Sequence, residues 1–176
     1  TLGKLGIARC ILMSEHESNL RSFMIGKPSV SEVPSEYREK ITQMRTSWYP
    51  LLMRLLNAGL PLDQLNEIFT NVSFVTFNYD RCLEYYLYNG LQRYYSITER
   101  EASAVMETVR IVHIYGSLGK MPWEGASDSI VPFGSMEHAH LPISANRIKT
   151  FTEIIASKIQ SSANRIVAGA QTLVFM

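Results

Sequence analysis

The sequence Val72-Ser-Phe-Val-Thr-Phe-Asn-Tyr-Asp80 sets the expectation for the fold. Up to Phe77 it is mostly β-branched or aromatic, without alternating polar residues, which is typical of a strand buried on both faces of a parallel sheet. Asn78 and Asp80 end this pattern, and a helix is expected from about Arg81 to Tyr95. The stretch therefore predicts a central strand that leads into a helix.

Downstream, the pattern of strand and helix repeats. A second helix, opened by Thr98 with Glu101 as a capping box, is expected to run to about Val109, and Arg110 to Tyr115 is the next strand candidate. After a long loop rich in Gly, Pro and Ser, we expect an extended segment at 147–153, a helix at 155–168 and a last strand at 172–176. This order predicts a three-layer α/β sandwich with a mainly parallel sheet and right-handed crossovers.

Upstream, the pattern is helical. Apolar residues recur every three to four positions from Lys4 to Phe23, and a loop with several breakers follows at 26–34. Ser35 can cap a helix that runs towards Met44, Trp48 to Leu56 has the apolar density of a buried helix, and 62–69 suggests a short helical turn. Without internal repeats, residues 1–176 are interpreted as a single domain.

Composition excludes several classes of protein. The 176 residues carry a formal net charge of +1 without basic clusters, which argues against nucleic acid as a partner. The longest apolar runs are far shorter than the roughly 20 residues of a membrane span. Two separated cysteines, Cys10 and Cys82, and no secretory leader indicate reduced thiols in the cytoplasm. Since the chain begins within a helical pattern and ends within a predicted strand, we expect a domain fragment, incomplete at both ends.

Chemistry is expected where the strands end, because ligands of open α/β sheets bind beyond the carboxyl ends of the strands. The first such place is Asn78 with Asp80, for which helix capping is the simpler alternative. The second is His113-Ile-Tyr-Gly-Ser-Leu-Gly119, where glycines let a ligand approach the backbone.

Together the two segments resemble the bacterial sirtuin-like domain family. Sirtuins carry a Thr-x-Asn-apolar-Asp motif, matched by Thr76 to Asp80, and later a His-Gly pair at a strand end, which aligns with Tyr115-Gly116. The chain is also similar to a subgroup of sirtuin-like bacterial proteins. This subgroup carries Phe-Asn-Tyr-Asp-Arg with a downstream Leu-Glu, matched by Phe77 to Glu84, and Tyr-Gly-Ser-Leu-Gly, matched by Tyr115 to Gly119. Further similarity to this subgroup lies at Gly3-Lys4, Glu15 and Trp48-Tyr49, so the resemblance covers most of the chain.

The resemblance implies a Rossmann-like, sirtuin-type core that binds NAD, a small dinucleotide, and hydrolyses its nicotinamide glycosidic bond as a bacterial defence effector. Asn78 would contact the nicotinamide ribose or orient the attacking water, and Asp80 would fix the loop. A base that accepts a proton from a ribose hydroxyl would contribute roughly 10²–10⁴-fold. The implied catalytic residues are Asn78, His113 and Tyr115. The implied NAD-binding residues are Thr76, Phe77, Asn78, Asp80, Gly116 and Ser117.

The sequence departs from the family at important positions. Tyr115 stands where sirtuins have the catalytic His, and a phenol with an ordinary pKa of about 10 is a poor base. His113 titrates in a more suitable range but lies roughly 6.5 Å further back along the strand. The Gly-rich phosphate loop is not found, and we expect it upstream of Thr1. The zinc-binding cysteines of protein deacylases are missing, so neither zinc nor deacylation is expected.

Alternatives from other classes stay open. One is a catalytically degenerate domain for nucleotide sensing or assembly, and another is a stable fragment without a function. Homo-oligomer formation is also left open. His138-Ala-His140 is interpreted as a solvated loop without a metal, and Cys82 as a small core residue. Trp123 and Phe133 either cover a ligand or fill the core. Five tyrosines between 85 and 95 are expected to pack against neighbouring side chains and not to stack on nucleic-acid bases.

Overall fold

A computed structural model describes residues 2–21, 35–125 and 128–175. The predicted loop at 26–34 and the predicted core position Phe23 lie outside these residues. The helices before the first strand are α1 (Leu2–Glu17), α3 (Ser35–Thr46), α4 (Trp48–Leu56) and the 3₁₀ helix η1 (Leu62–Glu67). From the first strand onward the elements are β1 (Ser73–Thr76), α5 (Cys82–Tyr95), α6 (Glu99–Met106), β2 (Arg110–His113), the 3₁₀ helix η2 (Pro122–Glu124), α7 (His140–Arg147) and α8 (Ser157–Gly169).

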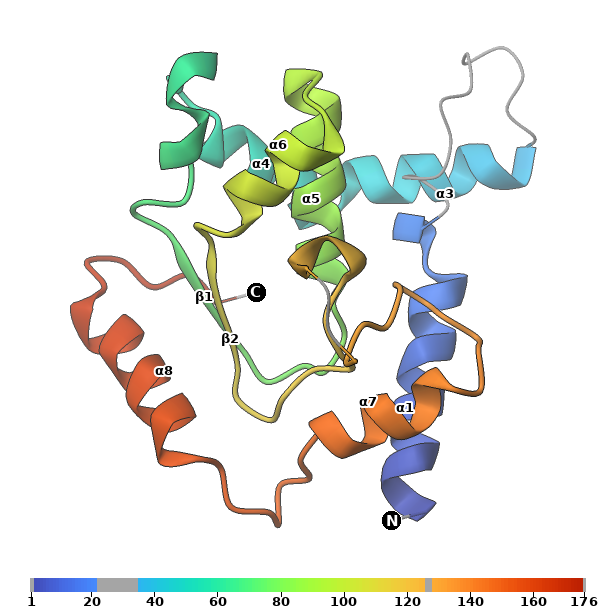
Figure 1. Cartoon of the computed structure of the whole chain (residues 1–176). Helices are drawn as coiled ribbons and strands as arrows, with labels where there is room; N and C mark the ends of the chain where they lie inside the picture. Colours follow the sequence, from blue (N-terminus) through green and yellow to red (C-terminus); the bar gives the residue numbers. More distant parts are fainter. Residues whose placement is uncertain (1, 22–34, 126–127, 176) are drawn as a thin grey trace.

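The chain is a mixed α/β structure around a small parallel sheet. Strands β1 and β2 pair in register from Ser73 opposite Arg110 to Thr76 opposite His113, and α5 and α6 form the connection between them (Figure 1). The expected parallel pairing of these two segments is confirmed. Within the described residues the sheet has two strands, and a separate, isolated parallel bridge forms between Lys120 and Ile130.

Two of the expected extended segments are not strands. Residues 170–175 have no regular structure, and Val174 and Phe175 are 73% and 91% exposed, so the predicted buried strand at 172–176 is wrong for the described residues. Its apolar composition cannot form a strand without a partner. The expected extended segment at 147–153 is also wrong as a whole, since α7 includes Arg147 and a turn begins at Phe151; between them, Ile148 is extended and 149–150 have no regular structure.

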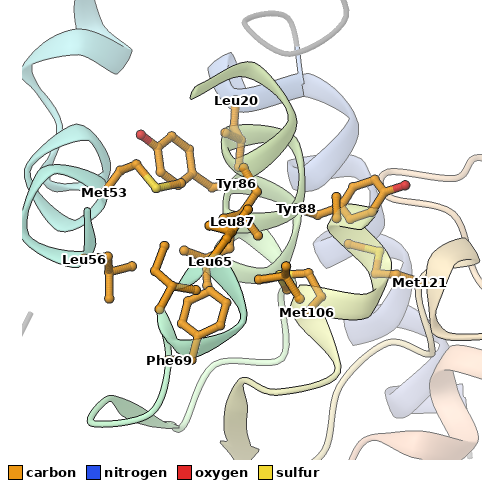
Figure 2. Packing of buried hydrophobic residues seen from close by; sticks show 14 of the residues in the cluster. Leu20, Met53, Leu56, Leu65, Phe69, Tyr86, Leu87, Tyr88, Met106 and Met121 are labelled. Carbon is orange, nitrogen blue, oxygen red and sulfur yellow. The ribbon is translucent and has the colours of Figure 1, made fainter. Parts of the chain in front are cut away.

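The main core forms around α5. Tyr86 and Leu87 of this helix are buried between α4 on one side and α6 on the other (Figure 2), and Leu91 belongs to the same cluster. Phe74 and Ile111, which are paired across the two strands, pack against the same cluster. The strands are therefore anchored to the α5 and α6 side of the molecule, while α8 also contacts both strands.

A second, smaller core lies between α1 and α7. Ala8 and Leu12 of α1 pack with Ala145 and Ile148 from the end of α7 (Figure 1). The loop residues Leu118 and Val131 complete this cluster. It holds the segment after α7 close to the ends of the strands, where the candidate site lies. Of the apolar residues that recur along α1, Met13 is 36% exposed.

The described part of the chain contains no helix that is both long and apolar enough to cross a lipid bilayer.

Candidate functional site

The parallel sheet brings the two sequence motifs to one edge. Thr76 and His113 are register partners, and the Ile114 amide donates to the Thr76 carbonyl at 2.9 Å. Beyond the strands the two loops stay together, because the Leu118 amide donates to the Tyr79 carbonyl at 3.3 Å. The predicted site residues of both motifs therefore gather at the carboxyl ends of β1 and β2.

Asn78 stands at this edge with its side chain open to solvent. The residue is exposed, and its backbone amide donates a hydrogen bond to the Thr76 hydroxyl at 3.1 Å. The neighbouring Phe77 is 65% exposed. Among the described residues, no hydrogen bond involves the Asn78 carboxamide, so this group is available to a ligand.

Asp80 hydrogen-bonds to the start of the following helix. Its Oδ1 accepts a hydrogen bond from the backbone amide of Cys82, the first residue of α5, at 3.1 Å, and Arg81 is the N-cap residue of this helix. Cys82 follows as a half-buried thiol, and burial, with the charge of Asp80 next in size, raises its pKa well above the ordinary value. Such a thiol is protonated and packs as a small core residue.

His113 is engaged at both ring nitrogens. Nδ1 lies 2.8 Å from the Asn78 carbonyl oxygen, and Nε2 lies 2.6 Å from Oε1 of Glu84 on α5. Both side chains are largely buried. His113 thus touches the predicted site through the backbone of Asn78 and has no ring nitrogen left for a ligand in this arrangement.

Tyr115 belongs to a loose aromatic group at the strand ends. Its ring centroid lies 6.1 Å from that of Phe77 and 6.5 Å from that of Tyr79. The segment after α7 joins the group, because the Lys149 amide donates to the Tyr115 carbonyl at 2.8 Å and the Tyr79 hydroxyl donates to the Lys149 carbonyl at 2.5 Å. Burial is the main reason that the pKa of Tyr79 is raised. The Tyr115 ring is half-buried, and no hydrogen bond of its hydroxyl is found within the described residues.

Gly116 is required by packing against the protein itself. Its φ is +82°, and a Cβ added there would lie 2.1 Å from the Arg147 carbonyl oxygen. The close approach that was expected from a ligand is therefore made by the end of α7. Ser117 is half-buried beside it.

Sequence reasoning missed the buried ion pair of Glu15 and Arg81, both 1% exposed. Arg81 Nε lies 3.1 Å from Glu15 Oε1, and an Arg81 terminal nitrogen lies 2.6 Å from Glu15 Oε2. The guanidinium also donates to the Val131 and Pro132 carbonyls, and Glu15 accepts from the Gly134 amide at 2.9 Å. One signal was present: Glu15 follows Leu12 by three residues, on the core face of α1.

The other candidate features have structural explanations. Trp123 stacks on Tyr88 at 3.8 Å and Phe133 on Tyr85 at 4.1 Å, so both aromatic residues fill the core. His140 pairs with the Ser135 hydroxyl at 2.7 Å. In the described ranges, no group of three or more His, Cys, Asp or Glu side chains could hold a metal ion. A shallow hollow of about 250 Å³, open to solvent, includes none of the strand-end residues and is lined by Arg9, Leu12, Ser135, Met136, Glu137, His138 and Leu141.

We call Asn78, Tyr115 and His113 the strand-end group. It presents an exposed carboxamide, a half-buried phenol and a hydrogen-bonded imidazole at one edge of a parallel sheet. A scan against protein-family models, a search of curated proteins and a search of solved structures each found no match.

Proposed function

We propose that the strand-end group binds NAD and that the protein hydrolyses its nicotinamide glycosidic bond. The observation that carries the proposal is the pairing of Thr76 with His113, which puts the open Asn78 carboxamide and Tyr115 at the same edge. This edge is where α/β sheets bind nucleotides. The resemblance of both motifs to sirtuin-like domains supplies the choice of ligand.

In this proposal water adds to the anomeric carbon of the nicotinamide ribose while the carbon–nitrogen bond to nicotinamide breaks. Nicotinamide leaves as a neutral ring, and the proton of the water passes to solvent. The Asn78 carboxamide orients the water or a ribose hydroxyl, and the Tyr115 hydroxyl exchanges hydrogen bonds with the ribose. Thr76, Phe77, Asp80, Gly116 and Ser117 shape the loops against the dinucleotide.

The proposal includes a larger sheet than the two strands described. A three-layer, Rossmann-like sandwich would need further strands and a Gly-rich phosphate loop in addition to the described elements. Support comes from the contacts of α8 with both strands, in addition to the core formed by α5 and α6. A cytoplasmic bacterial defence effector is the biological role proposed with this activity.

A second candidate is a nucleotide sensor without catalysis. The observation that favours it is the lack of a free base at the edge: a Tyr stands in the position of the sirtuin His, and both ring nitrogens of His113 are engaged. Binding of NAD without turnover would follow from this arrangement.

Nicotinamide release by the full-length natural protein at neutral pH tests the proposal. Asn78→Ala should lower release by about 10²-fold or more, since the positioned carboxamide is lost. Asn71→Ala is the matched control, because Asn71 is also exposed but precedes β1 at its other end. Tyr115→Phe should weaken turnover by removing only the hydroxyl.

Calorimetry with NAD separates the two candidates. Binding without nicotinamide release favours the sensor. Neither release nor binding by the natural protein contradicts both candidates. An equal loss of release in Asn78→Ala and Asn71→Ala contradicts the role of the Asn78 carboxamide.

A further inference from the structure

Glu84 and His113 form a largely buried pair directly behind Asn78. Their side chains are 17% and 11% exposed, and Glu84 Oε1 lies 2.6 Å from His113 Nε2. Since His113 ends β2 and Glu84 lies in the first turn of α5, the pair joins the strand edge to the helix that follows Asn78. The contact reaches Asn78 through its carbonyl oxygen, 2.8 Å from His113 Nδ1.

The chemistry of the partners fixes one proton on the ring. A carbonyl oxygen can only accept a hydrogen bond, so His113 Nδ1 must carry a proton and donate it to Asn78. The second ring nitrogen faces a carboxylate, and one proton lies between Nε2 and Glu84 Oε1. The imidazole thus holds the Asn78 backbone from one side and is itself held by Glu84 from the other.

The surrounding charges favour the doubly protonated ring. Burial is the largest single influence and lowers the pKa of His113, but the hydrogen bond and the charge of Glu84, the Asn78 carbonyl and the charge of Asp80 together outweigh it, so the net pKa is raised. The nearby Cys82 thiol and Tyr49 phenol stay neutral, because burial raises the pKa of each. Glu84 Oε2 is buried without a hydrogen-bond partner among the described residues, so the adjacent imidazolium provides the compensating charge.

We propose that Glu84 and His113 are a positioning pair that holds the Asn78 backbone and thereby sets where the Asn78 carboxamide stands at the strand edge. The role of that carboxamide in NAD chemistry rests on the proposed function, whereas the pair itself does not.

Nitrogen-15 resonances of the His113 ring test the pair without any ligand. The titration midpoint of the ring should lie above the ordinary value of about 6.5, and both ring nitrogens should be protonated at pH values below that midpoint. In Glu84→Gln the titration midpoint should fall below that of the natural protein, while the Nδ1 proton remains. A neutral ring with its proton on Nε2 overturns the proposal.

Two substitutions of His113 separate its two contacts. The side-chain nitrogen of Asn can occupy the position of Nδ1, and that of Gln the position of Nε2. His113→Asn should therefore keep the hydrogen bond to the Asn78 carbonyl, whereas His113→Gln should lose it and shift the Asn78 carbonyl carbon resonance upfield. If neither variant changes that resonance, the proposal is contradicted.

The NAD assay then links the pair to function. His113→Gln should lower kcat more than His113→Asn does, by on the order of tenfold, with a smaller change in KM. Thermal unfolding of both variants checks that each one is folded. If the natural protein shows the ring signature but does not bind NAD, the proposed function fails and the pair stands. If NAD is turned over with equal kcat by both variants, the positioning role fails and the hydrolase proposal stands.

Discussion

At the scale of single residues, the ion pair of Arg81 and Glu15 joins three parts of the chain. It links α1, the start of α5 and the loop from Val131 to Gly134. The guanidinium and the carboxylate are both satisfied by several hydrogen bonds, which offsets the cost of removing two charges from water. Arg81 directly follows Asp80, so this pair also fixes the chain just after the candidate site.

Removing one partner of this pair should destabilise the protein strongly. Glu15→Ala leaves a buried guanidinium without its counter-charge, and we expect a loss of about 3–5 kcal/mol in the free energy of unfolding. Urea titration followed by circular dichroism measures it.

Lys4→Ala is the matched control for this prediction. It removes the ion pair of Lys4 with Glu153, whose carboxylate side chain is 38% exposed. Only a small loss of stability is expected there, because solvent screens an exposed ion pair. Equal losses in the two variants would show that the buried pair contributes no more to the free energy of unfolding than the exposed pair does.

At the scale of elements, the turn after β2 is fixed by the end of α7. Gly116 has a positive φ and faces the Arg147 carbonyl. The Lys149 amide donates a hydrogen bond to the carbonyl of Tyr115, the residue before Gly116. The conformation of the predicted Tyr-Gly-Ser motif thus depends on a helix that lies far from it in the sequence.

Gly116→Ala should disturb this junction beyond the cost of its backbone conformation. Gly59 offers the control, because its φ is +75° and a Cβ there would meet no atom within 4 Å. Gly59→Ala should cost about 1–2 kcal/mol, and Gly116→Ala roughly 1–3 kcal/mol more from overpacking. Urea unfolding of both variants measures the difference, and equal costs would rule out the contact with Arg147.

Elements with complete local signals were predictable. The capping box of Thr98 and Glu101 is present at α6, and α5 follows the Asn-Tyr-Asp break as expected. Helix α7 was missed because Pro142 was interpreted as part of a loop, although Pro is tolerated in a first helical turn, where amides lack partners. The segment at 172–176 failed because a strand depends on a neighbour that no local pattern reveals.

At the scale of the whole molecule, burial is unevenly distributed. Helix α5 contributes Tyr86, Leu87, Tyr88 and Leu91 to the main core, whereas Ala163 is the one buried residue of α8. Apolar side chains around α8 are open to solvent, such as Ile154 at 89% exposure. Local stability should follow this distribution.

Hydrogen exchange should therefore rank the helices. We expect the amides of α8 to exchange at least about tenfold faster than those of α5, a difference of about 1.4 kcal/mol in opening free energy. Mass spectrometry of peptides from each helix after timed exchange measures this ratio. Similar protection of both helices would contradict the unequal role of the two elements.

For the candidate site, the pairing of the two strands was predictable, whereas the side-chain contacts around their ends were not. The parallel pairing follows from the order of strands and helices, and it places the strand ends before Asn78 and Tyr115 at one edge. The pairs Glu15–Arg81 and Glu84–His113 were not predicted from the sequence, because each joins two side chains whose proximity depends on how the helices pack. The functions of these residues stay predictions that the assays above address.

The parallel pairing of β1 with β2 also determines when the candidate site can appear during folding. Two parallel strands cannot be joined by a tight hairpin. Strand β2 therefore pairs with β1 only after the chain between the strands has formed α5 and α6 and brought the two strands together. The helices, with their local contacts, should form early, and the long-range contact of Thr76 with His113 late. We therefore expect the edge that carries Asn78 and Tyr115 to assemble late in folding, so that a nascent or partly unfolded chain would lack the candidate site.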